Sequence, residues 1–94
     1  MSDRVAVPLS KPLQHAGEEL HEISLREPCA TDYAKCGYPA SMVGERTYPE
    51  AAAILALIAR CGGLPPSVVG KLCTEDFNAC MAVLMNFFGE GATQ

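Results

Sequence analysis

The sequence predicts an α+β fold in which an N-terminal β-hairpin is followed by three to four packed α-helices. Before residue 28, apolar residues alternate with polar or small ones in two segments, which is the period of a half-buried strand. Residues 49–61 are apolar nearly all round, as in a helix packed on several sides. Between Phe77 and Phe88, large apolar residues recur at helical spacing. The 94 residues are enough for a single domain.

The hairpin is expected within residues 1–28. Its first strand shows alternation over residues 5–9, and its second strand shows it over residues 23–25. Gly17 lies between the two strands and can adopt a positive φ, so we expect a tight turn near residues 15–18. Two prolines in the first strand cannot donate to a ladder, which makes that strand an edge strand.

A short helix and a loop are expected next. Thr31 or Asp32 can cap a helix over residues 31–36 that stops at Gly37. Residues 37–48 contain two glycines, one proline and few large apolar side chains, which predicts a loop. Two readings of this loop stay open, a solvated connector and a contact site for a partner.

Residues 49–89 are expected to form the helical region. Pro49 suits the first turn of a helix over 49–61, and the glycines that follow this helix stop it. A short helix starts at the two prolines before Ser67, and Thr74 caps the last helix, which ends at Gly89. Residues 90–94 are expected to be a short tail.

The apolar stripe of the last helix is wider than one small core requires. It can be core alone, or core that also offers a contact surface, since Met-rich helices suit adaptable protein contacts. On the second reading, Met81, Met85 and Phe87 are the predicted partner-binding residues.

Composition and charge narrow the class of protein. The net charge is −4 and the basic residues are scattered singly, which argues against nucleic-acid binding. The longest apolar run extends only from Ala51 to Ala59, whereas a membrane span needs about 20 residues. An odd number of cysteines and an N-terminus without a signal pattern favour a reduced, cytoplasmic compartment.

The candidates for catalysis and metal binding are few. Cysteines recur at spacings wider than the C-x₂₋₄-C pairs of structural zinc sites, and the thiol of Cys36 has no histidine nearby in the sequence to act as a base. No phosphate-binding glycine motif occurs. The remaining metal candidates are side chains of the hairpin: His15, His21, Glu18, Glu19 and Glu22. Flexible side chains on a solvated ribbon seldom form such a site, so we expect no catalytic residue, no metal and no cofactor, and a protein that is not an enzyme.

Several motifs together resemble the small tail assembly chaperones of Mu-like and P2-like phages. The more specific ones are the Leu-Arg-Glu-Pro motif of residues 25–28 and the Ala-Arg-Cys-Gly-Gly-Leu-Pro-Pro-Ser-Val motif of residues 59–68. Leu-Ser-Lys-Pro at residues 9–12, the polar residues around Asp32, Thr-Glu-Asp-Phe at residues 74–77 and the closing Phe-Phe-Gly add to them. The resemblance covers about residues 8–89.

This resemblance implies a protein that acts during tail construction, in the cytoplasm of the bacterial host, and is absent from the mature virion. Such a chaperone is encoded between the tail tube and tape-measure genes of a phage or prophage. It binds the tape-measure protein and keeps it soluble, with the tail tube protein as a further partner. A homo-oligomer is compatible with the surplus of apolar helix. The alternative is a small prophage protein that binds and modulates a host protein.

Overall fold

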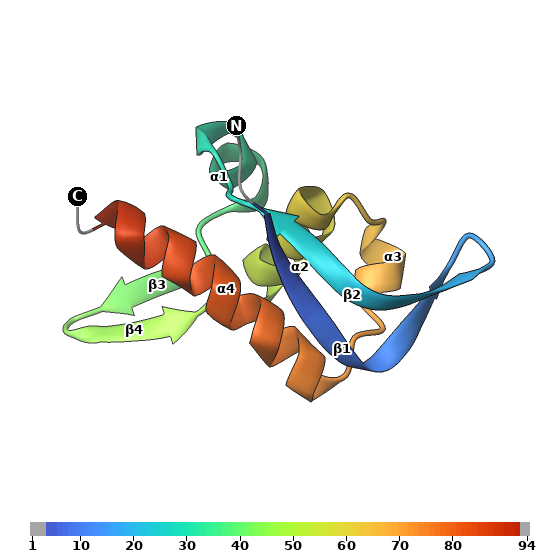
Figure 1. The fold of residues 1–94 in the computed structure, drawn as a ribbon. Helices are drawn as coiled ribbons and strands as arrows, with labels where there is room; N and C mark the ends of the chain where they lie inside the picture. Colours follow the sequence, from blue (N-terminus) through green and yellow to red (C-terminus); the bar gives the residue numbers. More distant parts are fainter. Residues whose placement is uncertain (1–3, 93–94) are drawn as a thin grey trace.

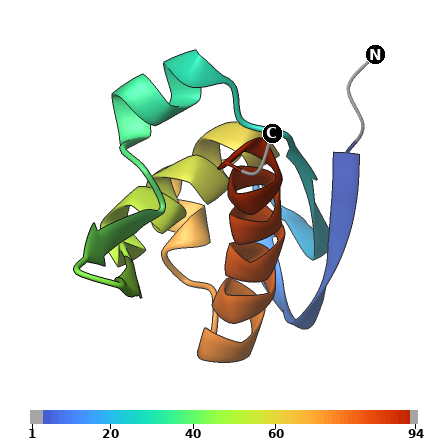
Figure 2. The ribbon, with the colours of Figure 1, turned by 90° about the vertical axis from the view of Figure 1, so that its left-hand side faces the viewer.

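The structure, a computed structural model, describes the backbone of residues 4–92 and the side chains of residues 4–88 (Figure 1). An antiparallel β-hairpin comes first, and further strands and helices follow it, so the predicted α+β class is confirmed. The helices lie on one side of the first hairpin (Figure 2). The elements in chain order are β1 (Arg4–His15), β2 (Glu18–Arg26), α1 (Ala30–Cys36), β3 (Ala40–Val43), β4 (Arg46–Pro49), α2 (Ala51–Gly62), α3 (Pro66–Val69) and α4 (Thr74–Ala92).

Strands β1 and β2 are joined by the predicted tight turn. His15 pairs with Glu18, so the loop consists of two residues. Both of them have left-handed backbone angles, with φ of 54° at Ala16 and 80° at Gly17. Turns of this kind match the right-handed twist of the flanking strands, and the glycine is the residue that adopts such angles without strain.

The ladder between β1 and β2 is interrupted between Pro8 and Leu13. Pro12 has no backbone N–H to offer there, and the amides of Ser10 and Lys11 are used by α4 instead. Beyond the interruption, the hairpin continues to a tip that projects from the helices (Figure 1). The molecule therefore measures 44 × 30 × 21 Å.

Helix α2 is central, as the sequence suggests. It contacts β2, α1, α3 and α4, and it approaches β2 so closely that a Cβ at Gly62 would lie 3.1 Å from Ile23 Cγ2. The helix ends at Gly62 and is capped by Gly63, which has a φ of 68°. The core is a single apolar cluster formed by Val7, Leu13, Ile23, Leu25, Ile54, Leu57, Ile58, Ala59, Cys61, Val69, Cys80 and Leu84.

Three predictions about the elements after α1 are wrong. The loop over 37–48 is instead a second hairpin made of β3 and β4. Pro49 is the last residue of β4, so the helix predicted over 49–61 begins at Ala51. The last helix extends to Ala92 and includes part of the predicted tail 90–94. The sequence does not reveal this second hairpin because neither of its faces is buried. A strand without a buried face needs no alternation of apolar and polar residues.

Among residues 4–92, no helix combines the length and the apolar character that crossing a membrane requires.

Candidate functional site

The second hairpin projects from the body, and its contacts with the rest of the described residues lie at its base. Its strands are joined by a two-residue loop in which Gly44 adopts a φ of 64°. At the base, Glu50 N–H donates to the carbonyl of Pro39 over 2.9 Å, and the Ser41 hydroxyl donates to the Glu50 carboxylate over 2.6 Å. Beyond these bonds the hairpin projects at one end of the molecule (Figures 1 and 2).

Large apolar side chains are exposed on this hairpin and directly before it. Met42 is 71% exposed, Val43 66% and Tyr38 62%, and Tyr48 is exposed as well. Among the described residues, they are four of the five large apolar side chains that are exposed. We call Tyr38, Met42, Val43 and Tyr48 the hairpin surface. Apolar surface concentrated in one place marks a protein contact more often than single exposed residues do.

An aromatic cluster connects the hairpin surface to two helices. The ring of Tyr38 lies 5.5 Å from that of Tyr33 on α1 and 5.5 Å from that of Phe88 on α4. The rings of Tyr33 and Phe88 are 5.9 Å apart and meet edge to face, which is a favourable arrangement. Burial raises the pKa of the Tyr33 hydroxyl. The cluster therefore fixes Tyr38 relative to the body, although most of its side chain is exposed.

The residues predicted to bind a partner lie on two flanks of α4. Residues Met81, Met85 and Phe88 follow one another at helical spacing, so they share the flank that faces the aromatic cluster. Phe87 is two residues beyond Met85, or about 200° around the helix. Met81 and Phe87 are half-buried and pack against the core. Partner binding by all three stays a prediction, and Met85 is the one placed beside the aromatic cluster without being part of the core.

A buried ion cluster joins the specific sequence motifs. Asp32 on α1 is 1% exposed. Its carboxylate accepts two hydrogen bonds from the Arg26 guanidinium, at 2.7 and 3.0 Å, and another from Arg60 Nε. The backbone N–H of Cys29 donates to it over 2.8 Å. Hydrogen bonding by Arg26 holds the pKa of Asp32 well below its usual range. This cluster ties β2, α1 and α2 together.

A second buried carboxylate connects α4 to the interrupted part of β1. Asp76 is 2% exposed and accepts the backbone N–H of Ser10 over 2.8 Å and that of Lys11 over 3.2 Å. The hydrogen bond from Ser10 lowers the pKa of Asp76. Backbone amides need hydrogen-bond partners, and Asp76 supplies them where the ladder with β2 is interrupted. The Leu-Ser-Lys-Pro and Thr-Glu-Asp-Phe motifs are thus two halves of one contact.

Comparison with known proteins identifies the family. The model of a family described as "Phage tail assembly chaperone proteins, E, or 41 or 14" matches residues 6–89. The chain belongs to the phage tail assembly chaperones. The resemblance stated from the motifs is therefore confirmed. No curated protein and no solved structure matches this chain.

Of the metal-ligand candidates, His15, Glu18, Glu19 and His21 lie on the projecting end of the first hairpin of this tail assembly chaperone. Glu22 pairs with Pro8, nearer the body. The ring of His21 is 3.4 Å from the Glu19 carboxylate, and both side chains are exposed. Within the described residues, no group of three or more potential ligands converges. The absence of a metal stays a prediction for this chaperone.

The cysteines of the tail assembly chaperone are free thiols. Cys61 and Cys80 are buried in the core, and burial raises the pKa of each to about 11. Both therefore stay neutral at ordinary pH, which suits their packing among apolar side chains. Cys36 is half-buried beside Lys35.

The contact between Asp76 and β1 gives a testable expectation for the tail assembly chaperone. Asp76→Asn should lower the melting temperature, because an amide has one acceptor oxygen for the two backbone N–H donors of Ser10 and Lys11. It should also expose the segment around Ser10 to proteases. Thermal melts and limited proteolysis measure the two effects. Glu75→Gln changes the exposed neighbour and is the control. Equal melting of Asp76→Asn and wild type would contradict this role.

Proposed function

We propose that this tail assembly chaperone binds the tape-measure protein and keeps it soluble while the tail is built. It acts in the cytoplasm of the host, without catalysis, and leaves before the virion is complete. The observation that carries the proposal is the hairpin surface, where apolar side chains are exposed on a projecting arm of a protein of the tail assembly chaperone family.

The shape of the hairpin surface suits a long apolar helical partner. Met42 and Val43 are neighbours in a strand, so their side chains point to opposite faces. The hairpin can therefore lie across a helix or between two helices and cover apolar side chains on both. Burying a side chain such as Met42 contributes about 1.5–3 kcal/mol. Each single contact is modest, so copies along a long partner would bind through avidity and still be released.

The charge of the chain also supports this role. The net charge of −4 would give a coated partner many like charges, and like charges keep particles apart in solution. An apolar partner covered by many copies would therefore stay dispersed.

Co-expression with fragments of the tape-measure protein tests the proposal. We expect each fragment to aggregate alone, and to be soluble and co-purify when the wild-type chaperone is present. A fragment whose solubility does not change with the chaperone, and that does not co-purify, would contradict tape-measure binding.

The predicted residues on α4 can be tested separately, since the structure distinguishes them. Met85→Gln should weaken co-purification and leave the melting temperature unchanged, because Met85 lies outside the core. Phe87→Gln should lower the free energy of unfolding by about 2 kcal/mol, since it removes packing against the core. Ala82→Gln, on the exposed face of the same helix, is the control for both. Undiminished co-purification of Met85→Gln would exclude this flank from the contact.

A further inference from the structure

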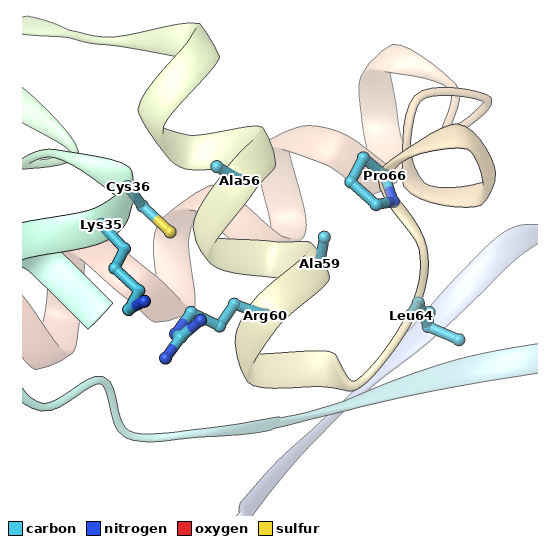
Figure 3. A pocket seen from close by; sticks show the side chains of 7 residues that line it. All are labelled: Lys35, Cys36, Ala56, Ala59, Arg60, Leu64 and Pro66. Carbon is cyan, nitrogen blue, oxygen red and sulfur yellow. The ribbon is translucent and has the colours of Figure 1, made fainter. Parts of the chain in front are cut away.

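A hollow beside α1 is lined by side chains of opposite character at its two ends. It lies between α1, the second half of α2 and the start of α3, and its volume is about 360 Å³. Lys35 and Arg60 lie at one end, and Leu64 and Pro66 lie at the other (Figure 3). Ala56 and other small side chains form its floor.

The cationic end of the hollow is suited to binding carboxylates. Arg60 donates its Nε to buried Asp32, which fixes the side chain. Within the described residues, its two terminal nitrogens make no hydrogen bond, and Lys35 makes no salt bridge. The two positive charges of Arg26 and Arg60 exceed the single negative charge of Asp32. The surroundings of the hollow therefore keep a positive potential, although the net charge of the chain is −4. A guanidinium with two free nitrogens binds carboxylates well.

The size of the hollow selects its occupant. A helix with its side chains is about 10–12 Å wide, whereas 360 Å³ is near the lower end of the range for small-ligand pockets. The hollow therefore has room for one or two side chains from a narrow element, such as the turn of a hairpin.

The chain itself carries a narrow acidic element that fits these requirements. The tip of the β1–β2 hairpin projects from the body (Figure 1) and holds Glu18 and Glu19, which are both exposed. Glu19 is near His21 and the amide of Gln14, and within the described residues Glu18 has no ionic partner. The tip thus offers carboxylates on a two-stranded turn.

We propose that the acidic tip of one copy docks in the Lys35–Arg60 hollow of a second copy. Tip and hollow are different surfaces, so the contact is heterologous and joins copies head to tail. Each copy keeps a free tip at one end and a free hollow at the other, and a row or a ring of copies can grow. This association needs no tape-measure protein and does not depend on the function proposed above.

The mass of the full-length chaperone alone, measured by sedimentation over a wide range of concentration, tests the proposal. We expect the mass to rise with concentration and to fall on addition of salt, which screens exposed charges. Lys35→Glu should raise the dissociation constant about a hundredfold, because a like-charge contact replaces an attractive one. Lys71→Glu, an exposed lysine outside the hollow, should associate like the wild type. Equal melting temperatures show that the variants are folded.

Mixing two variants tests the head-to-tail geometry. The double variant Glu18→Lys, Glu19→Lys has a defective tip and an intact hollow, and Lys35→Glu has the reverse. Each should be monomeric alone, and the mixture should form a dimer that cannot grow. A wild-type chain that stays monomeric, a Lys35→Glu variant that associates normally, or a mixture without dimers would each overturn the proposal. The proposal would also be overturned if the wild-type chain stayed monomeric and bound an acidic peptide of another protein.

Discussion

Replacing Asp32 by asparagine should lower the free energy of unfolding by about 3 kcal/mol. The carboxylate is buried and accepts hydrogen bonds from two arginines and one backbone amide. Asparagine keeps the shape but cannot balance the two positive charges. Because Arg26 and Arg60 both retain contact with water, we expect the lower end of the range for a broken buried ion pair. Small domains unfold with only 5–15 kcal/mol, so this loss is large, and it corresponds to about 15 °C in melting temperature.

Chemical denaturation of Asp32→Asn measures this loss, and Glu27→Gln provides the matched control. Glu27 is an exposed acid next to Arg26, so its replacement removes one negative charge without opening the cluster. We expect it to unfold like the wild type. If both variants lost the same free energy of unfolding, overall charge, and not the buried cluster, would be what stabilises the fold.

The same cluster makes stability depend on pH. Hydrogen bonding by Arg26 holds the pKa of Asp32 well below its usual range, whereas the pKa of an aspartate in the unfolded chain is about 3.9. The contribution of Asp32 is therefore complete above about pH 5 and is lost as the pH falls further. Asp76, whose pKa is also lowered, acts in the same direction. The difference in stability between wild type and Asp32→Asn should shrink as the pH is lowered from neutral to about 3.

The elements that bury one face could be predicted from the sequence, and the element that buries neither face could not. Alternation revealed β1 and β2, and uninterrupted apolar character revealed α2. The hairpin of β3 and β4 is held by its own ladder and by two hydrogen bonds at its base. It leaves no periodic apolar pattern, and only Gly44, at the centre of the segment, indicates a turn.

The sequence leaves residues 37–48 open as a contact site, but for the same reason it names no partner-binding residue within them. Helical spacing on the last helix indicates Met81, Met85 and Phe87, but Met81 and Phe87 pack against the core. Most of the exposed large apolar side chains lie instead in residues 37–48, the segment expected to be a loop. A signal was nevertheless present, since Tyr38, Met42, Val43 and Tyr48 are large apolar residues within a short polar stretch. The roles of Asp32 and Asp76 could not be inferred either, because their partners are distant in the sequence or use backbone amides.

The double variant Met42→Gln, Val43→Thr should weaken co-purification with tape-measure fragments at least about tenfold. Both replacements keep the shape of the side chain and add no charge, so they change little except the apolar character of the hairpin surface. Burial of two such side chains contributes about 3–6 kcal/mol, and a loss of only 1.4 kcal/mol already weakens binding tenfold. The melting temperature should not change, because both side chains are mostly exposed in the free chaperone.

Val5→Thr is the matched control, since Val5 is the one large apolar residue of the described part that is exposed outside the hairpin surface. It should co-purify like the wild type if location decides binding. Equal losses in Val5→Thr and in the double variant would mean that any exposed apolar residue contributes, and that the chaperone has no specific docking surface. A loss confined to the double variant would assign partner binding to the second hairpin. Helices α1 and α4, whose aromatic rings contact Tyr38, would then serve to hold that arm in place.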